Sequence, residues 1–97
     1  MTTTNKTTLQ HIGGMNLLAI SGGRVQALDE NAILLPVRHG YRVIVRYVPG
    51  VDLYDVERIM IRGGKITHKG TESHLYADQV GDSAYRASCY SDPFGEV

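Results

Sequence analysis

The sequence contains no tryptophan, one phenylalanine and a single cysteine, Cys89, among its 97 residues. A lone cysteine excludes an internal disulfide and an all-cysteine zinc site, and it is typical of proteins from a reducing compartment. The longest apolar stretches, such as the one from Ala32 to Val37, are far shorter than the roughly 20 residues that a membrane-spanning helix needs. We therefore expect a cytoplasmic protein.

A net charge is also lacking, because ten Lys and Arg residues balance ten Asp and Glu residues. A protein without a global field of one sign is neither a basic protein that coats nucleic acid nor an acidic mimic of DNA. With 42% hydrophobic and 21% charged residues, the composition is that of a chain that folds around a core. The length fits one domain.

The domain boundaries are predicted from the two ends. Residues 1–8 are polar and rich in threonine, and they lack the basic-then-apolar order of a secretory signal. We predict a flexible tail over residues 1–8, a single α+β domain over residues 9–90 and a C-terminal tail over residues 91–97.

Two helices are expected. A threonine before Leu9 can cap a short helix that runs to Ile12 and ends at the following glycine pair. A longer helix is predicted from about Ala77 to Tyr90, although Gly81 weakens it by roughly 1 kcal/mol relative to alanine. Its apolar stripe consists of Ala77, Val80, Ala84 and Ala87.

Glycine pairs mark the predicted turns. Met15–Ser21 and Arg24–Leu28 have strand-like composition, and the pair Gly22-Gly23 between them can supply the positive φ angles of a two-residue hairpin. A third strand is predicted over Ile33–Val37, and its proline indicates an edge or an end of pairing.

The clearest strand is Tyr41–Val48, in which the two faces alternate. The return strand, Leu53–Arg62, fits a register with three favourable cross-strand pairs: Tyr47 with Tyr54, Val45 with Val56, and Arg46 with Asp55. The same register would point Arg58 into the face of Val43. We therefore expect a bulge or a strand end near Glu57 and Arg58.

A second glycine turn, Gly63-Gly64, leads into a strand over Lys65–Lys69 and a further short strand up to Tyr76. The predicted fold class is α+β. It is a mostly antiparallel sheet of about five strands, with a short N-terminal helix and a longer C-terminal helix packed on one face.

Charge is unevenly distributed along the chain. The segment from Tyr41 to Gly70 has six basic and three acidic residues, and the segment from Thr71 onward has one basic and five acidic residues. If they share a face, the basic residues are the candidate macromolecule-binding residues: Arg42, Arg46, Arg58, Arg62, Lys65 and Lys69.

Catalytic and metal chemistry have no visible candidate. No serine or cysteine lies in a nucleophile motif, and Gly22-Gly23-Arg24 lacks the spacing of a phosphate-binding loop. His68 and His74 bracket Glu72, but two exposed histidines on a hairpin explain this spacing without zinc. We predict no enzyme activity, no metal and no cofactor.

Six tyrosines recur with arginines in a chain that has no tryptophan. On a sheet, exposed tyrosines can stack bases while basic side chains hold phosphates. The interpretation that we favour is structural: Tyr41, Tyr47 and Tyr54 fill the core face, and Arg42 and Arg46 solvate its back.

Four segments, taken in order, carry a resemblance: Leu9–Asn16, Ala19–Arg24, Asp52–Val56 and Leu75–Val80. Their pattern, GGMN, AISGGR, DLYDV and LYADQV, resembles a family of small uncharacterised proteins of bacteriophages and prophages. Members often have Met-Thr-Gly-Ala-Lys where this chain has Ile20–Arg24. The resemblance implies a phage-derived accessory protein in the host cytoplasm, and it brings no catalytic residues with it.

The predicted function is therefore non-catalytic binding of a host or phage macromolecule, with a protein favoured as the partner and modulation or inhibition of a host process as the outcome. The alternative is binding of nucleic acid through a basic and aromatic sheet face. A short chain with an open strand edge also favours a homodimer. No membrane partner is expected.

Overall fold

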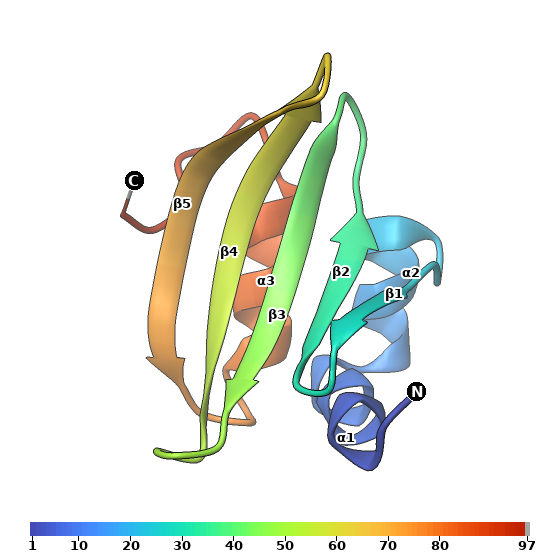
Figure 1. Ribbon diagram of the computed structural model, residues 1–97, viewed down its shortest axis with the longest axis vertical. Coiled ribbons are helices and arrows are strands. Elements are labelled where there is room, and N and C mark those ends of the chain that lie inside the picture. The colour runs from blue at the N-terminus through green and yellow to red at the C-terminus, as the bar shows by residue number, and fades with distance from the viewer. Residues whose placement is uncertain (97) are drawn as a thin grey trace.

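One antiparallel sheet with the strand order β1-β2-β3-β4-β5 forms the centre of the computed structural model, which describes residues 1–96 (Figure 1). Its strands are β1 (Gln26–Asp29), β2 (Ala32–Pro36), β3 (Tyr41–Val48), β4 (Leu53–Arg62) and β5 (Lys65–Leu75). The helices are α1 (Thr3–Ile12), α2 (Gly14–Ser21) and α3 (Val80–Ser88). The predicted α+β class with a mostly antiparallel sheet is confirmed.

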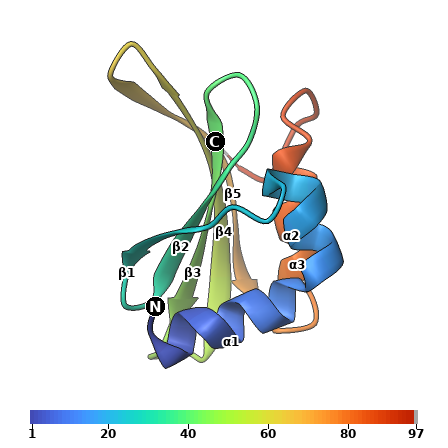
Figure 2. The ribbon, with the colours of Figure 1, turned by 90° about the vertical axis from the view of Figure 1, so that its right-hand side faces the viewer.

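The helices lie against one face and one end of the sheet, and the other face carries no helix (Figure 2). The core forms where α2 and α3 cover the inward side chains of the central strands. Val43, Val45 and Val56 have no exposed surface there. No helix among residues 1–96 is long and apolar enough to cross a membrane.

The β3–β4 register is the one predicted from the sequence, with Tyr47 opposite Tyr54 and Arg46 opposite Asp55. The turns at residues 49–52 and 63–64 are also confirmed. Strand β2 begins and ends one residue earlier than predicted, and Pro36 is its last paired residue.

The expected bulge or strand end near Glu57 and Arg58 is wrong for the β3–β4 pair, which continues unbroken past both residues. The irregularity lies on the opposite side, where Lys69 and Gly70 of β5 both face Arg58 alone. Gly70 has φ +133°, and a Cβ atom there would lie 1.9 Å from the carbonyl oxygen of Phe94. Only glycine fits this position. Strand β5 continues through this bulge to Leu75 as one element, where the sequence predicts two short strands.

The predicted flexible tail over residues 1–8 is wrong, because α1 begins at Thr3. The Thr2 hydroxyl accepts a hydrogen bond from the N–H of Asn5 (3.1 Å) and donates one to the carbonyl oxygen of Glu30 (2.8 Å). The Asn5 side chain is buried and donates to the carbonyl oxygen of Asp29 (2.8 Å). These contacts with the β1–β2 turn hold a segment that has little helix propensity of its own.

The predicted strand Met15–Ser21 is wrong, and so is the hairpin at Gly22-Gly23. The segment is helix α2, and Gly22 ends it in the left-handed conformation (φ +66°), with its N–H bonded to the carbonyl oxygen of Leu18 (2.9 Å). Glycine pairs serve helix ends and hairpins equally well. The strand after it starts at Gln26, two residues later than predicted.

The C-terminal helix starts at Val80 rather than Ala77, and its predicted apolar stripe is buried at Val80, Ala84 and Ala87. The region predicted as a C-terminal tail is anchored to the fold at two residues, although its other described residues are exposed. Phe94 is 4% exposed, and Glu96 exchanges backbone hydrogen bonds with Thr71 of β5 (2.9 and 3.0 Å). Val97 lies outside the described residues.

Candidate functional site

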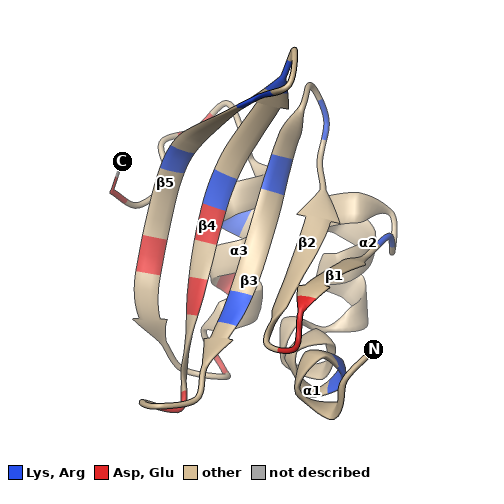
Figure 3. Cartoon of the chain, in the orientation of Figure 1, with Lys and Arg blue, Asp and Glu red and all other residues tan. Residues whose placement is uncertain are grey.

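The six basic residues predicted as a binding surface do not share one face of the sheet. Figure 3 shows Lys and Arg positions interspersed with Asp and Glu positions along the strands. Arg42 and Arg46 share the open face of β3, because they alternate with the buried Val43 and Val45. Arg62 and Lys65 flank the β4–β5 turn at one end of the sheet, and Lys69 lies in the β5 bulge. Arg58 points to the helix side.

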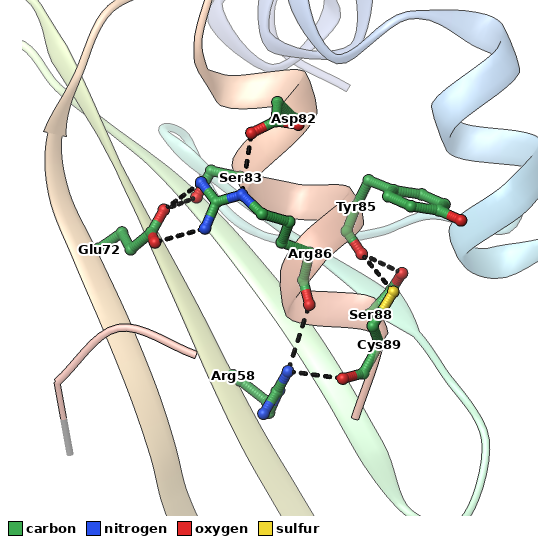
Figure 4. A network of polar contacts seen from close by, with 8 residues as sticks. All are labelled: Arg58, Glu72, Asp82, Ser83, Tyr85, Arg86, Ser88 and Cys89. Carbon is green, nitrogen blue, oxygen red and sulfur yellow. Dashed lines mark hydrogen bonds and ion pairs between the residues drawn. The ribbon is translucent and has the colours of Figure 1, made fainter. Parts of the chain in front are cut away.

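Arg58 is a structural residue, since it is 4% exposed and its side chain contacts the C-terminal end of α3. Its guanidinium donates to the carbonyl oxygens of Ala87 (2.8 Å), Cys89 (2.9 Å), Asp92 (2.6 Å) and Arg86 (3.2 Å). Figure 4 shows two of these contacts. Burial lowers the pKa of Arg58 from its ordinary value, but an arginine stays charged at neutral pH. The predicted role of Arg58 in macromolecule binding is therefore wrong.

The remaining charges of the open face are mixed in sign. Arg46 pairs with Asp29 (2.9 Å), and His68 lies 2.7 Å from Glu57. The backbone N–H of Asn31, followed by Arg46, holds the pKa of the Asp29 carboxyl below its usual range. Such a face has a weak net field, which disfavours a phosphate backbone as its partner.

A polar cluster between β5 and α3 joins the sheet to its helix (Figure 4). The Glu72 carboxylate accepts two hydrogen bonds from Arg86 (2.6 and 2.7 Å) and one from the Ser83 hydroxyl (2.7 Å). Arg86 also donates to Asp82 (2.9 Å). Arg86, and then Ser83, lower the pKa of the Glu72 carboxyl. Because the strong donors and acceptors of this cluster are already paired, it serves the fold.

The open face of the sheet carries an aliphatic stripe that the sequence analysis did not identify. The cross-strand register makes it continuous from β2 to β5: Leu34, Ile44, Ile59, Ile61 and Ile66. Leu34 and Ile59 are 8% and 6% exposed but lie outside the main core cluster, while Ile66 is 65% exposed. A solvated sheet face normally alternates to polar residues. This stripe is instead a partly exposed apolar surface, covered by neighbouring side chains at Leu34 and Ile59, half-buried at Ile44 and Ile61 and open at Ile66.

An aromatic pocket of about 440 Å³ lies between α1 and the end of the sheet where β3 meets β4. Tyr47 and Tyr54 form one wall, with ring centroids 5.4 Å apart, and the His11 ring contacts Tyr54 edge-on at 6.1 Å. Tyr76, which is 63% exposed, and Asp52 complete the rim. The volume lies in the range of small-ligand sites.

One contact fixes the acidic side of this aromatic pocket. The Tyr47 hydroxyl donates to Oδ1 of Asp52 at 2.5 Å, and this hydrogen bond raises the pKa of Tyr47 above its ordinary value. Asp52 has φ +56°, in the left-handed region, where Asp is tolerated better than most residues. The turn is closed by the Asp52 N–H, which donates to the carbonyl oxygen of Val48 (2.9 Å).

The tyrosines were predicted to fill the core face of the sheet, which holds for the buried Tyr54, while Tyr41 and Tyr47 are half-buried. The sequence signal for the pocket was the Tyr47–Tyr54 pair flanking a loop that contains Asp52. This signal does not suffice, because Thr3, Thr4 and Thr7, which line the pocket from α1, belong to the segment that the sequence predicts as a tail.

Residues 1–96 contain no group of three or more His, Cys, Asp or Glu side chains placed to hold a metal ion. Comparisons with protein-family models, curated proteins and solved structures found no match to this chain.

Proposed function

We propose that this chain is a small non-catalytic accessory protein of phage type that binds another protein, of the host or the phage, through the open face of its sheet. The observation that carries the proposal is the aliphatic stripe. Its five members run across four strands on the face without helices, and Ile66 at its end is 65% exposed. Partly exposed apolar surface on a sheet face, rimmed by polar residues, is typical of protein interaction sites.

The charges beside the stripe describe the partner. Arg42 lies opposite Ile59 and, among the described residues, donates only to the carbonyl oxygen of Tyr41 (3.2 Å). Its guanidinium is therefore free to meet a carboxylate, whereas Arg46 is already paired with Asp29. The partner is a protein with an apolar strip and an acidic residue that faces Arg42.

Capture from bacterial lysate, followed by binding of the purified partner, tests this surface. We expect Ile66→Lys and Arg42→Glu each to weaken binding at least about tenfold, because the first places a charge in the apolar contact and the second reverses the charge that meets the acidic residue of the partner. Met15→Lys is the matched control, since Met15 is an equally apolar, 84% exposed residue on α2. A partner that binds all three variants like the parent, or no enriched partner at all, would overturn the proposal.

Two other partners for the open face, a second copy of this chain and nucleic acid, are tested with variants of the same face. Sedimentation of the pure chain at micromolar to submillimolar concentration detects a second copy, and a dimer that Ile66→Lys dissociates would assign the face to self-association. Titration of fluorescent single- and double-stranded DNA and RNA tests nucleic acid. Binding that survives physiological salt and is lost in the double variant Arg42→Ala, Arg46→Ala would assign the open face to nucleic acid.

A further inference from the structure

We infer that the aromatic pocket binds an alkylammonium group, either of a small quaternary amine or of a lysine side chain. The site is separate from the open sheet face and does not depend on its function. Aromatic rings and one carboxylate are the features by which proteins recognise such cations, because the negative face of the ring and the carboxylate both attract positive charge.

The walls supply the rings. Tyr47 and Tyr54 lie side by side, with ring centroids 5.4 Å apart and planes tilted by 59°. Tyr54 is 4% exposed and backs the half-buried Tyr47, so Tyr47 supplies most of the ring surface that a ligand can reach on this wall. Tyr76, from the segment after β5, adds a third ring at the rim. A tetrahedral ammonium with methyl or methylene groups presents apolar, positively polarised surface in several directions, so one such group suits a pocket lined by both Tyr47 and Tyr76.

The charges of the lining select the sign of the ligand. Asp52 is acidic, and neither lysine nor arginine is present among the lining residues. The imidazole of the lining, His11, lies edge-on against Tyr54 on the side formed by α1. A phosphate or carboxylate ligand would lack a fixed cation and would be repelled by Asp52. The side of the pocket formed by α1 offers threonine hydroxyls, Thr3, Thr4 and Thr7, for polar groups attached to the ammonium.

The Tyr47–Asp52 hydrogen bond prepares the site before a ligand arrives. It uses only Oδ1 of Asp52, at 2.5 Å, so Oδ2 remains available as an acceptor. The same bond holds the Tyr47 ring against Tyr54. Preorganised groups lower the cost of binding, since fewer side chains must be ordered by the ligand.

Calorimetric or NMR titration of the full chain with choline tests the inference. We expect saturable binding, and binding at least about threefold weaker for its neutral isostere dimethylbutanol, which has the same shape without the charge. Peptides that contain trimethyllysine or unmodified lysine form the second arm. Tighter binding of a peptide than of choline assigns the site to a protein side chain, and the reverse order assigns it to a small amine.

Two variants locate the binding. Asp52→Asn removes the charge and keeps a residue that tolerates a positive φ, and Tyr76→Ala removes an exposed ring; each should weaken choline about three- to tenfold. Tyr85→Ala is the control, because Tyr85 is a 45% exposed tyrosine of α3 outside the pocket. Equal binding of choline and dimethylbutanol, no binding of any ammonium probe at millimolar concentration, or unchanged binding in both pocket variants would overturn the inference.

Discussion

The Arg58 guanidinium donates from Nε to the carbonyl oxygen of Ala87 at 2.8 Å, and this contact joins the centre of the sheet to the end of α3. The last carbonyl groups of a helix have no partners within the helix and carry its partial negative charge. A buried arginine on β4 therefore serves as the C-terminal cap of α3. The Phe94 ring, 5.3 Å from the guanidinium, covers it.

Replacing Arg58 with methionine should lower the free energy of unfolding by about 3 kcal/mol, because several buried carbonyl groups lose a charged donor at once. Urea unfolding followed by circular dichroism measures the loss. Arg42→Met is the control, since Arg42 lies on the open face, and its effect should stay within about 0.5 kcal/mol. Equal stability of the two variants would show that Arg58 does not hold α3.

The sequence predicted the sheet well where pairing is local. Tyr41–Val48 and Leu53–Arg62 are joined by a short loop, and their side-chain pairs alone select the register found in the structure. Arg58 shows the limit of that reasoning. An arginine on the core face is unfavourable locally, and it becomes favourable only because the end of α3, about 30 residues later, brings carbonyl groups to it.

The N-terminal third was predicted less well, for a related reason. Met15–Ser21 is a short, mostly apolar segment with Asn16 and Ser21 as its polar residues, so periodicity does not distinguish a strand from a helix there. Contacts with α3 and β2 decide for the helix. Residues 1–8 become helical through bonds to Asp29 and Glu30, which are distant in sequence. The aromatic pocket could not be predicted because one of its walls is α1.

Gly81 provides a test in which helix propensity and packing predict opposite signs. Propensity alone predicts that Gly81→Ala stabilises the chain by about 1 kcal/mol. A Cβ atom there would lie 2.7 Å from the carbonyl oxygen of Ile12 and 2.9 Å from Nδ2 of Asn16, where α3 crosses the α1–α2 junction. We therefore expect a loss of about 1–3 kcal/mol in thermal or urea unfolding.

The control for this comparison is Gly14→Ala, because no atom lies within 4 Å of a Cβ atom at Gly14. That variant should be neutral or slightly stabilising. A Gly81→Ala chain as stable as Gly14→Ala would mean that the helices separate easily at their crossing.

The contacts of Glu72 with Arg86 and Ser83, called the Glu72 clamp below, should make the stability of the fold depend on pH in the acid range. Arg86, and then Ser83, lower the folded pKa of Glu72 below its ordinary value of 4.5, so the folded state favours the carboxylate. The contribution is complete above about pH 4.5 and is lost as the pH falls through the lowered folded pKa. Because Arg86 is half-exposed, we expect only about 1 kcal/mol after solvent screening.

Urea unfolding at neutral pH and near pH 3, for the parent and Glu72→Gln, measures this contribution. The variant should be less stable at neutral pH and should approach the parent in acid. Asp78→Asn serves as the control, because Asp78 is an exposed carboxylate outside the clamp. A constant difference between parent and Glu72→Gln at all pH values would contradict the assignment.

The Tyr47–Asp52 pair should be visible as one tyrosine that ionises late. The hydrogen bond to Asp52 raises the folded pKa of Tyr47 above 10, so the bond is intact below pH 10 and is lost as the pH rises through the folded pKa. NMR titration of labelled tyrosine rings, with Tyr47→Phe to assign the signal, measures this value. Asp52→Asn should return it toward 10, whereas Asp92→Asn, outside the pocket, should leave it raised. A Tyr47 titration that ignores Asp52→Asn would show that the carboxylate does not position this ring, and the aromatic pocket would then lack its fixed acidic side.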